Sequence, residues 1–135
     1  MTTIPNSPSQ NEPKPASAPF ADGSSTLEDL KNLVRSFVGE RDWWRYHTPR
    51  NLAASISIEA AELLEHFQWT LEEGGRLDEQ KRREVSEEMS DVLSYLLSLA
   101  HVLDIDLSAA LAEKMKKNAT KYPSEQFQGT WTKVR

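Results

Sequence analysis

The chain has 135 residues, of which 27% are charged and 38% are hydrophobic, a composition that fits one globular domain with a modest core. Its formal net charge of -5 argues against general nucleic-acid binding, because proteins that bind nucleic acids normally present a basic surface. It contains no cysteine, so disulfide bonds and thiolate metal sites are excluded, and a reducing, cytoplasmic location is expected.

The N-terminal segment is expected to be a disordered tail. Five of the chain's seven prolines lie in it, and it lacks the basic and apolar regions of a secretory signal peptide. No later stretch approaches the length needed to span a membrane. We therefore expect a tail over residues 1–24, a helical catalytic domain over residues 25–123 and an irregular C-terminal tail over residues 124–135.

The first expected helix begins at Ser25-x-x-Glu28, which has the form of a capping box. Apolar residues then recur at helical spacing, and this pattern predicts a helix that runs to about Gly39. The following segment, residues 41–49, is expected to form a loop.

The second expected helix begins where Thr48, a good N-cap residue, precedes Pro49, which is well tolerated in a first helical turn. Its apolar pattern predicts that it lasts to about Trp69. The pair Gly74-Gly75 then interrupts the pattern.

The third and fourth expected helices occupy the C-terminal half of the domain. The third begins near residue 78 and is the longest, since its apolar period continues from residue 85 to residue 103 without glycine or proline. Asp106 is a suitable cap for a fourth helix over residues 107–120. No alternating strand pattern occurs, so the predicted fold class is an all-α four-helix bundle.

Two acidic pairs with the same spacing are the main candidates for chemistry. Glu59-x-x-Glu62 lies in the second expected helix, and Glu88-x-x-Asp91 lies in the third. At about 100° per helical residue, the two members of each pair lie about 60° apart, beside the apolar stripe of their helix. Burial of the two stripes against each other brings the four carboxylates together. Because like charges that are this close repel one another, a cation between them is expected.

The chemistry of these oxygen ligands suits Mg²⁺, which prefers carboxylates, water and substrate phosphates. An alternative is that the pairs lie on solvated helix faces, because glutamate is a common helix former. Glu65 and Glu87 are assigned to such surfaces, whereas Glu84, one turn before Glu88, is a candidate supporting group for the ligands.

A di-iron carboxylate site is excluded by spacing, because it needs Glu-x-x-His on two helices. His66 follows Glu62 by four residues, which does not match that motif. His66 lies on the Glu59 side of its helix, where it either supports the ligands or forms part of the surface or core edge.

Aromatic and basic residues form the second group of candidates. The aromatic candidates are Trp43, Trp44, Tyr46, Trp69 and Tyr95. Such rings either stack on a base, at about 1–3 kcal/mol per base, or pack in cores and interfaces. The basic face of the fourth expected helix, Lys114, Lys117, Asn118 and Lys121, either holds phosphate oxygens or interacts with the helix dipole.

Several motifs occur together in one order: Arg41-Asp42-Trp43, His47-x-Pro49-Arg50-Asn51, Glu59-x-x-Glu62, Phe67-Gln68-Trp69, and Glu88-x-x-Asp91 with Tyr95. Together they resemble the all-α MazG-like nucleotide pyrophosphohydrolases, and most closely their dCTP pyrophosphatase branch. The resemblance extends from about residue 27 to residue 123.

The resemblance implies Mg²⁺-dependent hydrolysis of a nucleoside triphosphate, preferably dCTP or a modified pyrimidine deoxynucleotide, to the monophosphate and pyrophosphate. It implies that this reaction removes unwanted nucleotides from the cellular pool. The catalytic, metal-binding residues implied are Glu59, Glu62, Glu88 and Asp91. The substrate-binding residues implied are Trp43, Trp69 and Tyr95 around the base, with His47, Lys114, Asn118 and Tyr122 in the nucleotide pocket.

The resemblance also implies a homotetramer or homodimer whose sites combine residues of different copies. Phe37, Trp44 and Leu97 are expected to supply apolar surface that such an assembly covers. Neither a nucleic-acid polymer nor a membrane is an expected partner. Two alternatives stay open: a related pyrophosphohydrolase for dUTP or damaged purine triphosphates, and a non-catalytic helical module whose acidic face binds a basic partner.

Overall fold

The computed structural model describes residues 20–69 and 77–130, and all the regular secondary structure in these ranges is helical. The elements in order are α1 (Leu27–Glu40), the 3₁₀ helix η1 (Trp44–Tyr46), α2 (Pro49–Glu65), α3 (Glu79–Val102), α4 (Leu107–Lys121) and α5 (Ser124–Phe127). The predicted all-α class is therefore confirmed. Most of the predicted N-terminal tail, residues 1–19, lies outside the described residues.

The capping box of α1 is one residue later than the sequence pattern indicated. The backbone N–H of Asp29 donates to Oγ1 of Thr26, and the backbone N–H of Thr26 donates to Oδ2 of Asp29. Ser25 instead accepts a hydrogen bond from the backbone N–H of Ala21, within the preceding turn. The predicted Ser25–Glu28 box is wrong because Ser25 is engaged by this earlier turn.

The other three predicted helix starts are correct, since Thr48, Asp78 and Asp106 each accept a hydrogen bond from the backbone N–H three residues later. However, α2 ends at Glu65, four residues before the predicted end at Trp69. Tighter bonds to the carbonyl three residues back, such as the one from Phe67 to Leu64, replace the α-helical pattern there.

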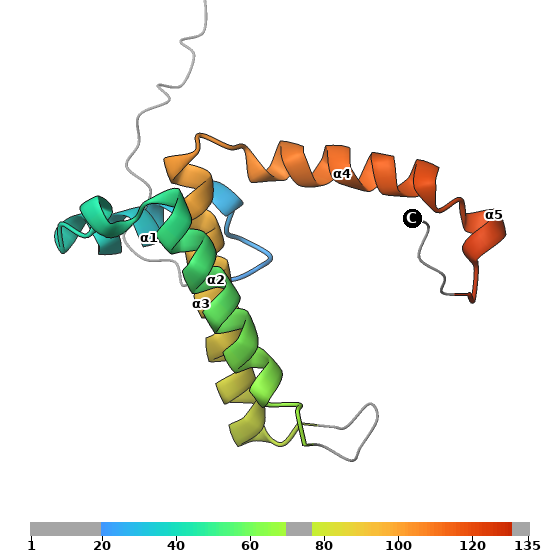
Figure 1. Ribbon diagram of the computed structural model, residues 1–135, viewed down its shortest axis with the longest axis horizontal. Coiled ribbons are helices and arrows are strands. Elements are labelled where there is room, and N and C mark those ends of the chain that lie inside the picture. Colours follow the sequence, from blue (N-terminus) through green and yellow to red (C-terminus); the bar gives the residue numbers. More distant parts are fainter. Residues whose placement is uncertain (1–19, 70–76, 131–135) are drawn as a thin grey trace, which may run out of the picture.

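Helices α2 and α3 run side by side in opposite directions (Figure 1). Helix α1 packs across the C-terminal half of α3. The buried apolar side chains come from α1, α2 and α3: Val38, Leu52, Val85, Leu97 and Ala100. Leu97 was expected to be exposed, but only 2% of it is, because it faces this core. Phe37 is half exposed, as expected, whereas Trp44 is partly buried.

Helix α4 leaves the other helices instead of packing against them. The chain bends by 102° between α3 and α4, at a junction where Asp104 has a positive φ of 53°. Figure 1 shows α4 projecting away from the α2–α3 pair. Its Leu111 and Met115 side chains are 62% and 49% exposed. The predicted four-helix bundle is therefore not formed within the described part of a single chain.

Beyond α4, the segment expected to be irregular begins with the short helix α5, whose Phe127 meets Tyr122 edge-on at 5.2 Å between ring centroids. Within residues 20–69 and 77–130, no single helix is long and apolar enough to cross a membrane. Helices α3 and α4 meet that test only when they are taken together across their bend.

Candidate active site

Three carboxylates converge where α2 and α3 face each other. Glu59 of α2 and Glu88 and Asp91 of α3 each offer an oxygen, and these oxygens lie within 4.8 Å of one another. We call these three residues the acidic triad. Each predicted pair borders the apolar stripe of its helix, so the packing of α2 on α3 brings members of both pairs together.

Glu62 is the member of the predicted set that lies outside the triad. It is exposed on α2, one turn beyond Glu59. Its charge still acts on the triad, because it is one of the groups that raise the pKa of Glu59. The structure thus brings three of the four carboxylates into direct proximity and leaves the fourth beside them.

The pKa of Glu59 is raised above its ordinary value of 4.5, first by partial burial and then by repulsion from Glu62, Asp91 and Glu88. Such repulsion is relieved when a cation lies between the carboxylates. The donors are all carboxylate oxygens, which are the ligands that hard divalent cations such as Mg²⁺ prefer. The residues present therefore fit a magnesium site.

A cavity of about 470 Å³ opens beside the acidic triad. It lies between α1, the loop around η1 and α3, and its lining residues are Leu33, Val34, Phe37, Val38, Trp43, His47, Asp91, Ser94, Tyr95 and Ser98. Asp91 belongs to both the triad and this lining, so the two features are continuous. The volume lies within the range of small-molecule sites.

The chain also matches known proteins. The model of the MazG-like family matches residues 54–134, which include both acidic pairs. The chain belongs to the MazG-like family.

Two curated relatives of this MazG-like chain are mammalian proteins named dCTP pyrophosphatase 1. The protein from Rattus norvegicus is 40% identical over 123 residues, which cover 88% of this chain and 72% of the relative. The protein from Bos taurus is 38% identical over 125 residues, which cover 90% of this chain and 74% of the relative.

A solved structure supports the same grouping. The crystal structure of a pyrophosphatase from Archaeoglobus fulgidus has a TM-score of 0.64 and 48% identity, covering 72% of this chain and 92% of that chain. The resemblance stated from the motifs is thus confirmed, as is the enzyme class, a nucleoside triphosphate pyrophosphohydrolase.

Three of the residues predicted to contact the nucleotide line the cavity: Trp43, His47 and Tyr95. Nδ1 of His47 is 2.8 Å from the carbonyl oxygen of Trp43, which restrains the loop that carries both. Trp44 has a packing role instead, because its ring lies 5.4 Å from that of His47 and 4.9 Å from that of His101.

The other four predicted substrate-binding residues do not reach the cavity in a single chain. Trp69 follows the end of α2 and is 85% exposed. Lys114 and Asn118 lie on α4 and Tyr122 lies at its end, and none of the three lines the cavity. Figure 1 shows α4 projecting away from α2 and α3 after the bend. They lie apart because this bend directs α4 outward.

Part of the cavity wall is not predicted by the sequence pattern. Apolar residues recur at helical spacing in α1, but this period alone does not predict that the helix lines a pocket. Ser94 and Ser98 were also missed, although they recur with Asp91 and Tyr95 on one face of α3. Their i, i+3, i+7 spacing from Asp91 was the available signal.

Proposed function

We propose that the chain hydrolyses dCTP, or a modified pyrimidine deoxynucleoside triphosphate, to the monophosphate and pyrophosphate in the presence of Mg²⁺. The observation that carries the proposal is the continuity between the acidic triad and an aromatic-lined cavity through Asp91. A triphosphate at the triad places its nucleoside toward the cavity. The relatives named dCTP pyrophosphatase 1 support the choice of dCTP.

Each group has a distinct task in this proposal. Glu59, Glu88 and Asp91 hold Mg²⁺, with Glu62 beside them. When bound, Mg²⁺ neutralises phosphate charge and lowers the pKa of a coordinated water. Trp43 and Tyr95 offer ring faces for the base, and the apolar face of α1 excludes water from that end of the cavity.

We further propose that a complete site needs a second copy of the chain, as in a homodimer or homotetramer. Trp69, Lys114, Asn118 and Tyr122 lie apart from the cavity of their own chain, so another copy is required to bring them to it. Apolar side chains that such an assembly would cover are exposed on α3 and α4: Met89, Leu93, Leu96, Leu111 and Met115.

The proposed setting is the cytoplasm, where the reaction removes unwanted pyrimidine triphosphates from the nucleotide pool. A related preference, for dUTP or a damaged purine triphosphate, uses the same acidic triad. It differs only in the fit of the base to the cavity.

The test is chromatographic product analysis with purified full-length protein and a panel of nucleoside triphosphates, including dCTP, 5-modified dCTP and dUTP. We expect monophosphate and pyrophosphate to form fastest with dCTP or its 5-modified forms, and only without a chelator. Glu88→Gln should lower the rate at least about 100-fold, while Glu87→Gln, at an exposed neighbouring position, should not. Preference for dUTP or a purine overturns the base assignment, and turnover in excess chelator overturns the metal site.

A further inference from the structure

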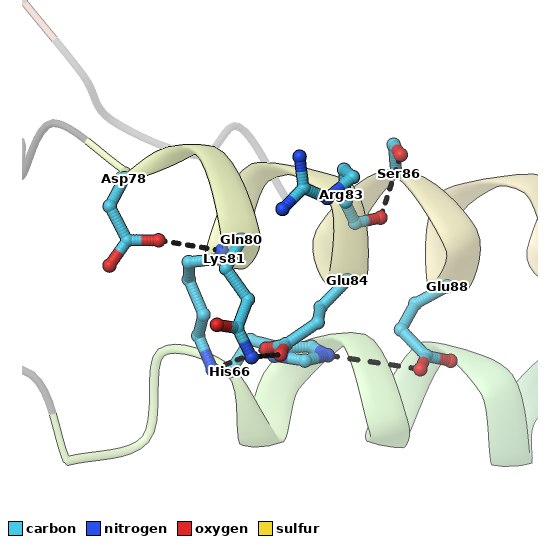
Figure 2. A network of polar contacts seen from close by, with 8 residues as sticks. All are labelled: His66, Asp78, Gln80, Lys81, Arg83, Glu84, Ser86 and Glu88. Carbon is cyan, nitrogen blue, oxygen red and sulfur yellow. Dashed lines mark hydrogen bonds and ion pairs between the residues drawn. The ribbon is translucent and has the colours of Figure 1, made fainter.

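The imidazole ring of His66 lies between two carboxylates of α3, those of Glu84 and Glu88 (Figure 2). Nε2 of His66 is 3.7 Å from Oε1 of Glu88, and Nδ1 is 3.8 Å from Oε2 of Glu84. Only 16% of the His66 side chain is exposed, so its surroundings restrict the orientation of the ring. One ring nitrogen thus faces a member of the acidic triad, and the other faces a residue outside it.

Glu84 is itself held by two residues of the first turns of α3. The side-chain amide of Gln80 donates a hydrogen bond of 3.1 Å to Oε1 of Glu84, and Nζ of Lys81 lies 3.7 Å from Oε2 (Figure 2). Glu84 therefore presents a restrained carboxylate to Nδ1 of His66. The contacts form a continuous series from the start of α3, through the end of α2, to the acidic triad.

A ring nitrogen of His66 faces the carboxylate of Glu88 at close range. Glu88 is 21% exposed, and it contributes an oxygen to the acidic triad while Oε1 faces the ring. Rotation of this carboxylate would move it away from the ring or change its position toward Glu59 and Asp91. Partners that orient metal-binding side chains in this way commonly change metal affinity by about 10–100-fold.

We propose that His66 is a positioning residue that holds Glu88 in the orientation needed to bind a divalent cation, and that Glu84 acts on Glu88 through His66. This rests on the proposed function, because it presumes that the acidic triad holds such a cation. His66 itself binds neither the ion nor the nucleotide. Its contribution is to align one carboxylate before the ion arrives.

Three substitutions of His66 test its contact with Glu88 separately from its contact with Glu84. His66→Gln places an amide nitrogen near the position of Nε2 and can keep the contact with Glu88. His66→Asn places one near Nδ1 and can keep only the contact with Glu84. His66→Ala removes both contacts, and Glu65→Gln, at the exposed preceding position, is the matched control.

The primary measurement is Mn²⁺ binding, followed by the electron paramagnetic resonance signal of free Mn²⁺ without nucleotide and at one fixed pH. We expect about tenfold weaker binding for His66→Ala and His66→Asn, binding within about threefold of the wild type for His66→Gln, and no change for Glu65→Gln. The Mg²⁺ concentration for half-maximal dCTP hydrolysis should shift in parallel. The KM for dCTP at saturating Mg²⁺ should stay within about twofold of the wild type.

The role of Glu84 is tested by a double-mutant cycle. Glu84→Gln should weaken Mn²⁺ binding in the wild type but cause no further loss in His66→Ala, because Glu84 acts through the ring. If the losses of Mn²⁺ affinity from Glu84→Gln and His66→Ala were additive, Glu84 would not act through His66. Circular dichroism checks that each variant is folded.

Three results would overturn the role of His66. These are wild-type Mn²⁺ affinity in His66→Ala, tighter Mn²⁺ binding in His66→Ala, or Mn²⁺ affinity that is kept in His66→Asn but lost in His66→Gln. These results concern His66 alone if the wild type binds Mn²⁺ and Glu88→Gln does not. If the wild type binds no Mn²⁺, or Glu88→Gln binds it normally, the metal site of the proposed function fails as well.

Discussion

Glu59 lies among three other carboxylates, and this position determines how its charge affects stability. Burial and repulsion from Glu62, Asp91 and Glu88 raise its pKa above 4.5 in the folded protein. The folded state therefore binds the proton of the Glu59 carboxyl more tightly than the unfolded chain does. Its contribution to the free energy of unfolding decreases as the pH rises from about 4.5 through the raised pKa, and it stays lost at neutral pH.

Glu59→Gln should consequently stabilise the metal-free protein at neutral pH. We expect the Tm in excess chelator to rise at pH 7.5 and the difference from the wild type to vanish near pH 3, where the Glu59 carboxyl is protonated in both the folded and the unfolded state. Differential scanning calorimetry at both pH values measures this. The same variant should lose at least about 100-fold in hydrolysis with Mg²⁺. An equal Tm difference at both pH values would contradict the electrostatic explanation.

Among the elements, α1 has a function beyond its contribution to the core. Its apolar face provides Leu33, Val34, Phe37 and Val38 to the cavity wall. The capping box of Thr26 and Asp29 supports the N-terminal end of this helix, away from the acidic triad. The stability of α1 and the chemistry of the triad should therefore respond to different substitutions.

Thr26→Ala tests that separation. It removes the N-cap of α1 and should lower the free energy of unfolding by about 1 kcal/mol, measured by urea denaturation. Ser25→Ala is the matched control, because Ser25 accepts a hydrogen bond from Ala21 and does not cap the helix. At saturating dCTP and Mg²⁺, kcat should change less than about twofold in both variants. Equal destabilisation by the two substitutions would contradict the capping register.

For the whole molecule, the arrangement of α4 raises the question of how the site is completed. One chain holds the acidic triad and the cavity, while the exposed Trp69 and the polar residues of α4 lie elsewhere. If another copy brings Trp69 to the cavity, each site takes its acidic triad from one chain and its Trp69 from another. A chain with a substituted triad can then still supply an intact Trp69 to its partner. Mixed oligomers can then regain activity.

We expect Glu88→Gln and Trp69→Ala, each impaired alone, to recover about a quarter of wild-type activity with dCTP when their subunits are exchanged. Native mass spectrometry verifies that mixed oligomers form. Exchange between Glu88→Gln and Asp91→Asn is the control, because both changes lie in the acidic triad of one chain and should give no recovery. Mixed oligomers without recovery in the first pair would contradict a shared site.

Local sequence patterns suffice to predict the helical class, three of the four helix starts and the residues of the acidic pairs. These features depend on local interactions: Thr48, Asp78 and Asp106 cap the backbone three residues ahead, and an apolar period places Glu59 and Glu88 beside a stripe. The one wrong helix start was at Ser25, because Ser25 and the adjacent Thr26 are both suitable N-cap residues. In the structure the hydroxyl of Thr26 accepts from the N–H of Asp29, whereas that of Ser25 accepts from the N–H of Ala21.

How these local elements meet depends on tertiary packing. The bend at Asp104 directs α4 away from the other helices, so Lys114 and Asn118 lie apart from the cavity, although the family resemblance implied that they line the nucleotide pocket. The packing of α2 on α3 brings Glu59 to Glu88 but leaves Glu62 outside, and it places His66 between two carboxylates. Such relations join residues that are distant in sequence, and they depend on relative helix positions that a single-helix period does not contain.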